Sequence, residues 1–125
     1  MKQAAVQFGT TAAVWGLGAI GLNAVYGCKR AGAKNIIGID INDGKREIGE
    51  AYGVTEFINP NKLDKPLDEY LAEKYHGGVD FAFECIGNQA VLDMTLKSLS
   101  PFGTAVLVGL APAGTEIRYP ARHML

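Results

Sequence analysis

A glycine-rich segment that follows an apolar run constrains the fold of this chain more than any other feature. Residues 14–21 read Val-Trp-Gly-Leu-Gly-Ala-Ile-Gly, and a carboxylate, Asp40, stands nineteen residues further on, directly after the apolar residues 36–39. The order of strand, glycine turn, helix, strand and carboxylate is typical of a dinucleotide-binding βαβ unit. The alternative, that the glycines serve only a strand-to-helix turn, stays open.

The residues of this pattern each have a chemical task in such a unit. Gly16 allows the tight turn out of the strand, and Gly21 lets the helix pack against that strand. Gly18 lacks a Cβ atom, so a pyrophosphate can approach the backbone, where free N–H groups and the positive end of the helix dipole face it. Asp40 is expected to accept hydrogen bonds from the hydroxyl groups of the adenosine ribose.

The composition predicts one globular domain in a reducing compartment. The chain has 125 residues and a formal net charge of −1, and its Lys and Arg residues are scattered. This pattern argues against binding to nucleic acid or to an anionic membrane surface, and no apolar run is long enough to span a membrane. We expect no signal peptide, reduced thiols at Cys28 and Cys85, and a cytoplasmic protein.

Strand and helix patterns alternate along the chain. Short apolar runs predict strands at residues 11–15, 35–40, 56–58, 79–84 and 104–108. Helical patterns follow at residues 19–31, 43–52, 67–75 and 89–99, with Asn42 or Asp43 as the N-cap of the second helix. A turn is expected at residues 101–103, and a short extended piece from Glu116 to Tyr119.

This alternation predicts an α/β protein of three layers, in which helices cover both faces of a parallel sheet. Right-handed crossovers make it a doubly wound, Rossmann-type fold. We expect one domain over residues 1–125, truncated at the C-terminal edge of its sheet. Ligands of such sheets bind beyond the carboxyl ends of the strands. Residues 16–21, 40–42, 84–88 and 108–110 are all predicted to lie there.

The residues around Asp40 favour NAD over NADP. A carboxylate suits free 2′ and 3′ hydroxyl groups, whereas a unit charge on a 2′-phosphate about 4 Å away would be repelled by roughly 4 kcal/mol at an effective dielectric of about 20. No Arg directly follows Asp40 to receive that phosphate, because Ile41 and Asn42 occupy the next positions. Lys45 either reaches the adenosine ribose or is a solvated helix lysine.

Six segments of the chain carry a more specific likeness than the glycine pattern alone. They are residues 16–21, 27–29, 39–42, 56–60, 77–81 and 83–87. Together, in order and in register, they closely resemble the zinc-dependent medium-chain alcohol dehydrogenases, nearest to the classical and the glutathione-dependent formaldehyde-oxidising members. The likeness extends from about Thr10 to Leu125.

The resemblance implies which residues contact the cofactor. Ile20 would press on the nicotinamide ring, Ile41 and Ile86 would sandwich the adenine, and backbone groups of Val108 and Leu110 would meet the carboxamide. The alternative, that Ile41 and Ile86 are plain core residues, stays open. The full expected set is Gly16, Leu17, Gly18, Ala19, Ile20, Asp40, Ile41, Lys45, Cys85, Ile86, Asn88, Val108, Gly109 and Leu110.

The chain also departs from the family pattern. Ala19 stands where glycine is common, and Asn88 stands where an Arg often lies beside the adenine. More seriously, full-length members hold a catalytic zinc through Cys and His residues of a separate N-terminal domain, which this chain lacks. His76 and His123 are expected to be solvent-facing residues rather than substitute ligands. We therefore expect no metal site and no catalytic residue here.

The resemblance implies that the parent protein is an NAD-dependent alcohol dehydrogenase, in which zinc assists hydride transfer between an alcohol and NAD. This chain would be its NAD-binding domain and inactive alone. One alternative is a non-catalytic NAD-binding or assembly module, and another is a methyltransferase, which the residues Ile20 and Gly21 disfavour. We also expect a dimer or larger assembly, with Glu116 to Tyr119 pairing with a second copy at the open sheet edge.

Overall fold

The five predicted strands lie in one parallel sheet in the order β3-β2-β1-β4-β5. The structure, a computed structural model, describes residues 9–109 and 112–118. The strands are β1 (Thr11–Trp15), β2 (Asn35–Ile39), β3 (Glu56–Ile58), β4 (Val79–Glu84) and β5 (Leu99–Leu107). The helices are α1 (Ala19–Arg30), α2 (Arg46–Tyr52), α3 (Leu67–Lys74) and α4 (Gln89–Lys97), with 3-10 turns η1 (Asp43–Lys45) and η2 (Pro60–Lys62). The chain winds outward from β1 in both directions, which confirms the Rossmann-type fold.

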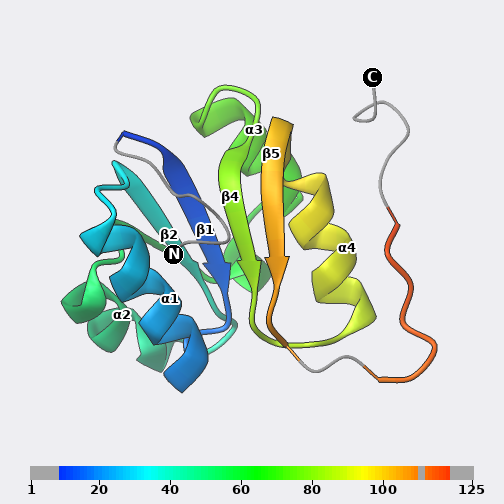
Figure 1. The fold of residues 1–125 in the computed structure, drawn as a ribbon, viewed down its shortest axis with the longest axis horizontal. Helices are drawn as coiled ribbons and strands as arrows, with labels where there is room; N and C mark the ends of the chain where they lie inside the picture. Colours follow the sequence, from blue (N-terminus) through cyan, green and yellow to red (C-terminus); the bar gives the residue numbers. More distant parts are fainter. Residues whose placement is uncertain (1–8, 110–111, 119–125) are drawn as a thin grey trace.

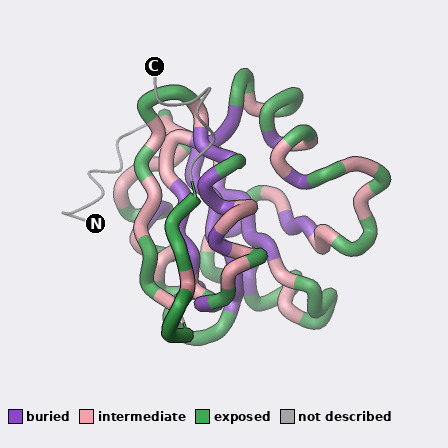
Figure 2. Tube along the Cα trace, turned by 90° about the vertical axis from the view of Figure 1, so that its right-hand side faces the viewer, coloured by how far each residue is buried: buried purple, intermediate pink, exposed green. Residues whose placement is uncertain are grey.

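Helices cover both faces of the sheet (Figure 1). On one face, α1 and α2 enclose a core cluster that includes Val25 and Phe57. On the other face, α3 and α4 enclose a second cluster that includes Leu71 and Leu96. Figure 2 shows buried residues along the central strands and exposed residues on the loops, as expected for a sheet covered on both sides. The predicted three-layer architecture is therefore confirmed.

The boundary between α4 and β5 differs from the prediction. We expected a helix over residues 89–99 and a strand only from residue 104, but the helix ends at Lys97 and β5 begins at Leu99, which pairs with Val79. The next paired residues are 81 and 104, so the predicted turn at 101–103 is an irregularity inside one strand. Phe102 within it has a φ of 68° and is 98% exposed.

Two further segments refine the predictions. The second predicted helix begins as the 3-10 turn η1, and Asn42 is its cap, because Asn42 Oδ1 accepts a hydrogen bond from the Gly44 N–H at 2.9 Å. In the segment from Glu116 to Tyr119, residues 116–118 form no strand. The Glu116 N–H and C=O bond to the side-chain amide of Gln89 on α4, both at 2.8 Å. Tyr119 lies outside the described residues.

None of the helices in residues 9–109 and 112–118 combines the length and the apolar character that a membrane crossing requires. Within the same ranges, no group of three or more His, Cys, Asp or Glu residues could hold a metal ion. His76 is exposed, as predicted. His123 lies outside the described residues.

Candidate cofactor-binding site

The turn between β1 and α1 depends on two close approaches, one to a side chain and one to backbone. Gly16 has a φ of 93°, and its N–H donates to the Ile39 carbonyl oxygen at 2.8 Å. A Cβ atom on Gly16 would lie 2.7 Å from Cγ1 of Ile86, and one on Gly21 would lie 1.6 Å from the Gly16 carbonyl oxygen. The first approach brings the loop after β4 against the turn. The second seats the start of α1 on the turn, which is the packing role predicted for Gly21.

The start of α1 is open toward the carboxyl ends of the strands. Gly18 is the N-cap residue, no side chain caps the helix, and the first turn holds no acidic residue. Apart from Gly18 and the residues next to it in the chain, no atom of the described residues lies within 4 Å of the place where a Gly18 Cβ would stand. The first N–H groups of an α-helix have no partner inside the helix. Their position beside open space provides a place for an anion.

Asp40 follows β2 and fastens the glycine turn. Its Oδ2 accepts a hydrogen bond from the Leu17 N–H at 2.9 Å, and its Oδ1 accepts one from the Asn42 N–H at 2.9 Å. The residue is half-buried. A carboxylate has about four acceptor positions, so capacity remains for hydroxyl donors of a ligand. Asp40 therefore has a structural task in the turn, which the sequence pattern alone does not reveal.

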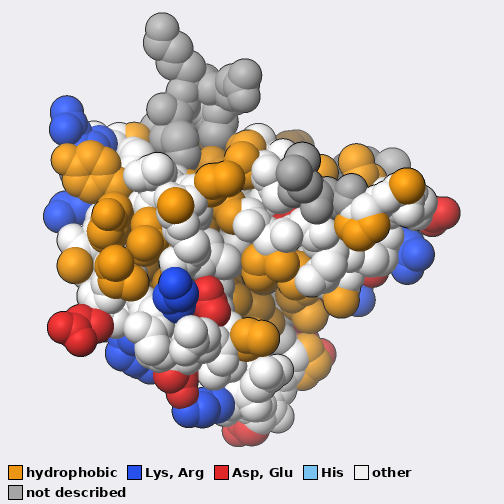
Figure 3. Space-filling model, turned by 90° about the horizontal axis from the view of Figure 1, so that it is seen from below, with side chains coloured by type: hydrophobic (Ala, Val, Ile, Leu, Met, Phe, Trp, Pro, Cys, Tyr) orange, Lys and Arg blue, Asp and Glu red, His pale blue; other side chains and the backbone are white. Residues whose placement is uncertain are grey.

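An apolar cleft of about 160 Å³ opens beside Asp40. Ile41 and Ile86 are 68% and 45% exposed, so the alternative that they are core residues is wrong. Figure 3 looks onto this face of the molecule, where hydrophobic side chains gather near the middle beside charged groups. The cleft is lined by Trp15, Ile39, Asp40, Ile41, Pro60, Ile86, Asn88 and Val91. Its volume and apolar walls suit a flat heterocyclic ring.

Asn88 has a second task that the resemblance did not suggest. Its side-chain oxygen accepts a hydrogen bond from the Val91 N–H at 2.9 Å and so caps α4. The residue nonetheless lines the cleft. Lys45 is half-buried and closes the η1 turn in the same loop region as Asp40. Its contact with a ribose stays a prediction.

The ends of β4 and β5 lie together on the other side of the glycine turn. The N–H groups of Val108 and Gly109 both donate to the Glu84 carbonyl oxygen, at 2.8 and 2.9 Å. A Cβ atom on Gly109 would lie 2.5 Å from the Gly87 nitrogen, so the two loops touch backbone to backbone. Ile20, in the first turn of α1, is 59% exposed. Leu110, which belongs to the predicted set, lies outside the described residues.

Cys28 and Cys85 are free thiols that pack in and against the core cluster on the α1 and α2 face, and the predicted contact of Cys85 with a cofactor stays a prediction. The Cys85 N–H donates to the Trp15 carbonyl oxygen at 3.0 Å and holds the loop beside β1. Burial raises the pKa of the Cys85 thiol to about 11, and burial likewise raises the pKa of the Cys28 thiol to about 11. Both stay protonated near neutral pH, which makes them poor nucleophiles and poor metal ligands.

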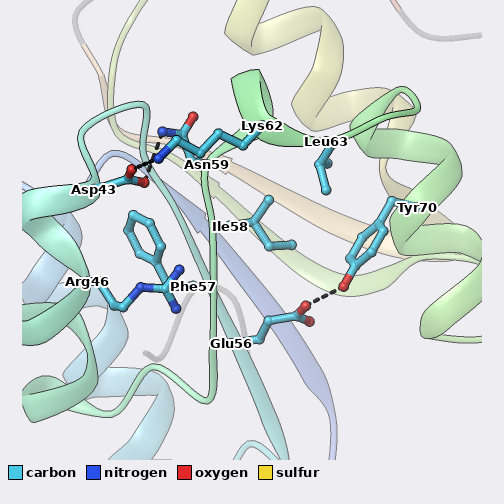
Figure 4. A pocket seen from close by; sticks show the side chains of 9 residues that line it. All are labelled: Asp43, Arg46, Glu56, Phe57, Ile58, Asn59, Lys62, Leu63 and Tyr70. Carbon is cyan, nitrogen blue, oxygen red and sulfur yellow. Dashed lines mark hydrogen bonds and ion pairs between the residues drawn. The ribbon is translucent and has the colours of Figure 1, made fainter.

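A larger cleft, of about 340 Å³, lies along the edge strand β3 between α2 and α3 (Figure 4). Its polar groups are satisfied by one another: Lys62 pairs with Asp43, and the Tyr70 hydroxyl donates to Glu56. The Arg46 guanidinium stacks 4.8 Å from the centre of the Phe57 ring. Residues predicted to bind a cofactor do not line this cleft. Size alone therefore does not identify the site.

The chain matches the zinc-binding dehydrogenase family over residues 19–125. It is 51% identical to geraniol dehydrogenase of Carpoglyphus lactis over 122 residues, which are 98% of this chain and 32% of that protein. It is 46% identical to the class-3 alcohol dehydrogenase of Zea mays over 115 residues, which are 91% of this chain and 30% of that protein. The chain thus spans about a third of the length of these curated relatives.

Solved structures show the same likeness. A zinc-binding-domain alcohol dehydrogenase protein from Burkholderia ambifaria superposes with a TM-score of 0.90 at 33% identity, covering 98% of this chain and 32% of that chain. A zinc-binding dehydrogenase from Sinorhizobium meliloti 1021, solved bound to NADP, superposes with a TM-score of 0.89 at 28% identity, covering 98% of this chain and 36% of that chain.

Proposed function

Because the chain belongs to the zinc-binding dehydrogenase family, we propose that it is the NAD-binding domain of a zinc-dependent alcohol dehydrogenase. The family binds NAD or NADP, and relatives of this chain are alcohol dehydrogenases. The observation that carries the proposal is the Asp40 carboxylate, held against the glycine turn through Leu17 and bordering an apolar cleft. A dinucleotide presents a pyrophosphate, a ribose and an adenine in that same order.

The residues of this chain fit the cofactor in three places. The N–H groups that open α1 at Gly18 and Ala19 would hold the pyrophosphate, since anions are stabilised at a helix N-terminus. Asp40 would accept hydrogen bonds from the adenosine ribose, each worth about 1.5–3 kcal/mol for a charged acceptor. Ile41 and Ile86 would flank the adenine and withdraw their exposed surface from water.

The nicotinamide half would meet Ile20 and the end of β5. Ile20 would bear on the nicotinamide ring, and backbone groups of Val108 and Leu110 would orient the carboxamide. Bound NAD supplies the hydride acceptor of the reaction. What this chain contributes is position, because it directs one face of the ring away from the sheet and toward the substrate.

The residues described in this chain do not fit a zinc ion, because no group of three or more possible ligands occurs among them. No catalytic step is therefore assigned to these residues. We propose that the chain alone binds NAD and oxidises no alcohol, with the metal chemistry supplied by a part of the parent protein outside it. Ethanol oxidation by the purified 125-residue chain would overturn the proposal that the chain is inactive alone.

A non-catalytic NAD-binding or assembly module is the second candidate, and it needs the same glycines and the same Asp40 carboxylate as the first. The coding sequence that flanks the chain distinguishes the two candidates. An alcohol dehydrogenase is expected to encode Cys and His zinc ligands upstream, and a non-catalytic module is not. Calorimetry that measures the binding of NAD and of S-adenosylmethionine in parallel titrations distinguishes a dehydrogenase domain from a methyltransferase. We expect heat of binding with NAD only, and binding of the methyl donor alone would reject a dehydrogenase domain.

We further propose that the protein is cytoplasmic and self-associates at the edge formed by β5. The two reduced thiols support a reducing compartment. Pairing of the segment from Glu116 to Tyr119 with a second copy would require release of the bonds between Glu116 and Gln89. A monomer by light scattering at high concentration would reject self-association.

A further inference from the structure

Glu84 is a buried carboxylate for which the proposed function has no use so far. It is the last residue of β4, and only 2% of its surface is exposed. Its Oε1 accepts hydrogen bonds from the N–H groups of Ile86 and Gly87, the latter at 2.7 Å. No ion pair among the described residues involves it. Backbone N–H groups, and not a cation, therefore offset the cost of burying this side chain.

The backbone of Glu84 makes a second set of bonds. Its carbonyl oxygen accepts the N–H groups of Val108 at 2.8 Å and of Gly109 at 2.9 Å. The space between Gly109 and Gly87 is too small for a Cβ atom. The loop after β4 and the end of β5 are thus one packed unit, and Glu84 is the residue that bonds to both parts.

The two parts of this unit face the two halves of the proposed cofactor. Ile86 forms a wall of the apolar cleft beside Asp40. It also touches the glycine turn, since a Cβ atom on Gly16 would lie 2.7 Å from Ile86 Cγ1. Val108 stands at the end of β5, where the carboxamide is proposed to bind. A displacement of the unit would therefore disturb the adenine and nicotinamide sides together.

We propose that Glu84 is a positioning residue of the cofactor site, which holds the Ile86 wall and the end of β5 in the arrangement that binds NAD. This inference rests on the proposed function. Ligand affinity falls in proportion to the population of the binding-ready conformation. Loss of the carboxylate leaves two N–H groups without an acceptor, and the loop then exchanges among other conformations.

Two substitutions at Glu84 separate positioning from bulk stability. Glu84→Gln keeps one side-chain acceptor oxygen for both N–H groups, whereas Glu84→Leu keeps the approximate volume and removes the side-chain acceptors. The matched control is Glu56→Leu. Glu56 is a half-buried carboxylate at the start of β3 that bonds to the Tyr70 and Tyr75 hydroxyls, away from the cleft beside Asp40.

The experiment uses the 125-residue chain and measures binding of NAD and of AMP, which carries the adenine half. Titrations are made at a temperature where circular dichroism shows each variant to be folded. If the binding-ready loop is populated about one tenth of the time in Glu84→Leu, both dissociation constants rise about tenfold. By the same relation, the dissociation constants of Glu84→Gln are expected to stay within about threefold of those of the original chain, and the dissociation constants of Glu56→Leu within about twofold.

Amide resonances of Ile86 and Gly87 give a readout that does not depend on the cofactor. The chemical shifts of both resonances are expected to change in Glu84→Gln, because a neutral amide replaces a charged acceptor. They are expected to stay unchanged in Glu56→Leu. Unmoved resonances in Glu84→Gln would overturn the anchoring, even if Glu84→Leu fails to fold. So would unchanged NAD affinity in folded Glu84→Leu. Absence of NAD binding by the unsubstituted chain would instead overturn the proposed function.

Discussion

Replacement of Asp40 by Asn tests the origin of the proposed preference for NAD. The Asp40 carboxylate accepts the Leu17 and Asn42 N–H groups, one on each oxygen, both at 2.9 Å. Asparagine offers one acceptor oxygen in place of two, so one of these bonds is lost together with the negative charge. The substitution thus changes ribose binding, phosphate repulsion and the fastening of the turn at once.

The expected magnitudes differ for the two coenzymes. For NAD, loss of a charge-assisted bond to the ribose costs about 1.5–3 kcal/mol. For NADP, the substitution also removes repulsion between unit charges about 4 Å apart, which is roughly 1 kcal/mol in water and roughly 4 kcal/mol at an effective dielectric of 20. Asp40 is half-buried, so we take about 2 kcal/mol for the repulsion. The preference for NAD over NADP should therefore fall by at least about 100-fold.

Trp15 supplies the assay, because it is the single tryptophan of the chain and lines the cleft beside Asp40. Its fluorescence is titrated with NAD and with NADP for the original chain and for Asp40→Asn. The affinity for NADP should increase by less than the loss of repulsion alone predicts, because a less firmly held turn weakens the binding of both coenzymes. Asp43→Asn is the matched control, since Asp43 pairs with Lys62 at the surface. An unchanged preference in folded Asp40→Asn would refute the reasoning.

Four further substitutions or measurements test other parts of the account. Gly21→Ala, whose Cβ would lie 1.6 Å from the Gly16 carbonyl oxygen, should destabilise the fold by about 3 kcal/mol or more in denaturant unfolding. Gly18→Ala adds a Cβ that no described residue beyond its chain neighbours approaches within 4 Å, so it should leave stability nearly unchanged and weaken NAD binding. The reverse ranking would contradict the turn geometry. The Cys85 thiol, whose pKa burial raises to about 11, should react with iodoacetamide slowly near neutral pH and faster only in strong base; a rate that levels off below pH 9 would count against its burial. Burial opposes ionisation of Glu56, but hydrogen bonds from tyrosine hydroxyls and a lysine outweigh it and lower the pKa of that carboxyl. The ionised Glu56 carboxylate therefore stabilises the fold at pH values above the carboxyl pKa of the unfolded chain, and this stabilisation is lost as pH falls through the lower pKa of the folded chain. Glu56→Gln should accordingly destabilise the protein at neutral pH and have little effect in acid.

Much of the fold could be predicted because its local signals agree with one another. β1, β3 and β4 begin and end at the predicted residues. The predicted boundary between α4 and β5 was wrong. Leu96 and Leu99 both fit the helical period, but Leu99 pairs with Val79 in the sheet. That pairing joins residues twenty positions apart, and helical periodicity carries no information about it.

The site shows the same division between local and long-range information. The position of Asp40 after a strand marked it as a ligand residue, but its bond to Leu17 depends on how two strand ends meet in space. Glu84 stood inside a recognised segment, and its carboxylate at the end of an apolar strand was a signal that could have been used. Its burial and its two N–H partners became visible only in the folded chain.

A crystal structure of the chain soaked in NAD tests the central claim most directly. The account predicts a pyrophosphate against the N–H groups that open α1 near Gly18, an adenosine ribose hydrogen-bonded to Asp40, and an adenine between Ile41 and Ile86. Intact crystals at saturating NAD with that cleft empty, or with the coenzyme bound along β3 instead, would contradict it.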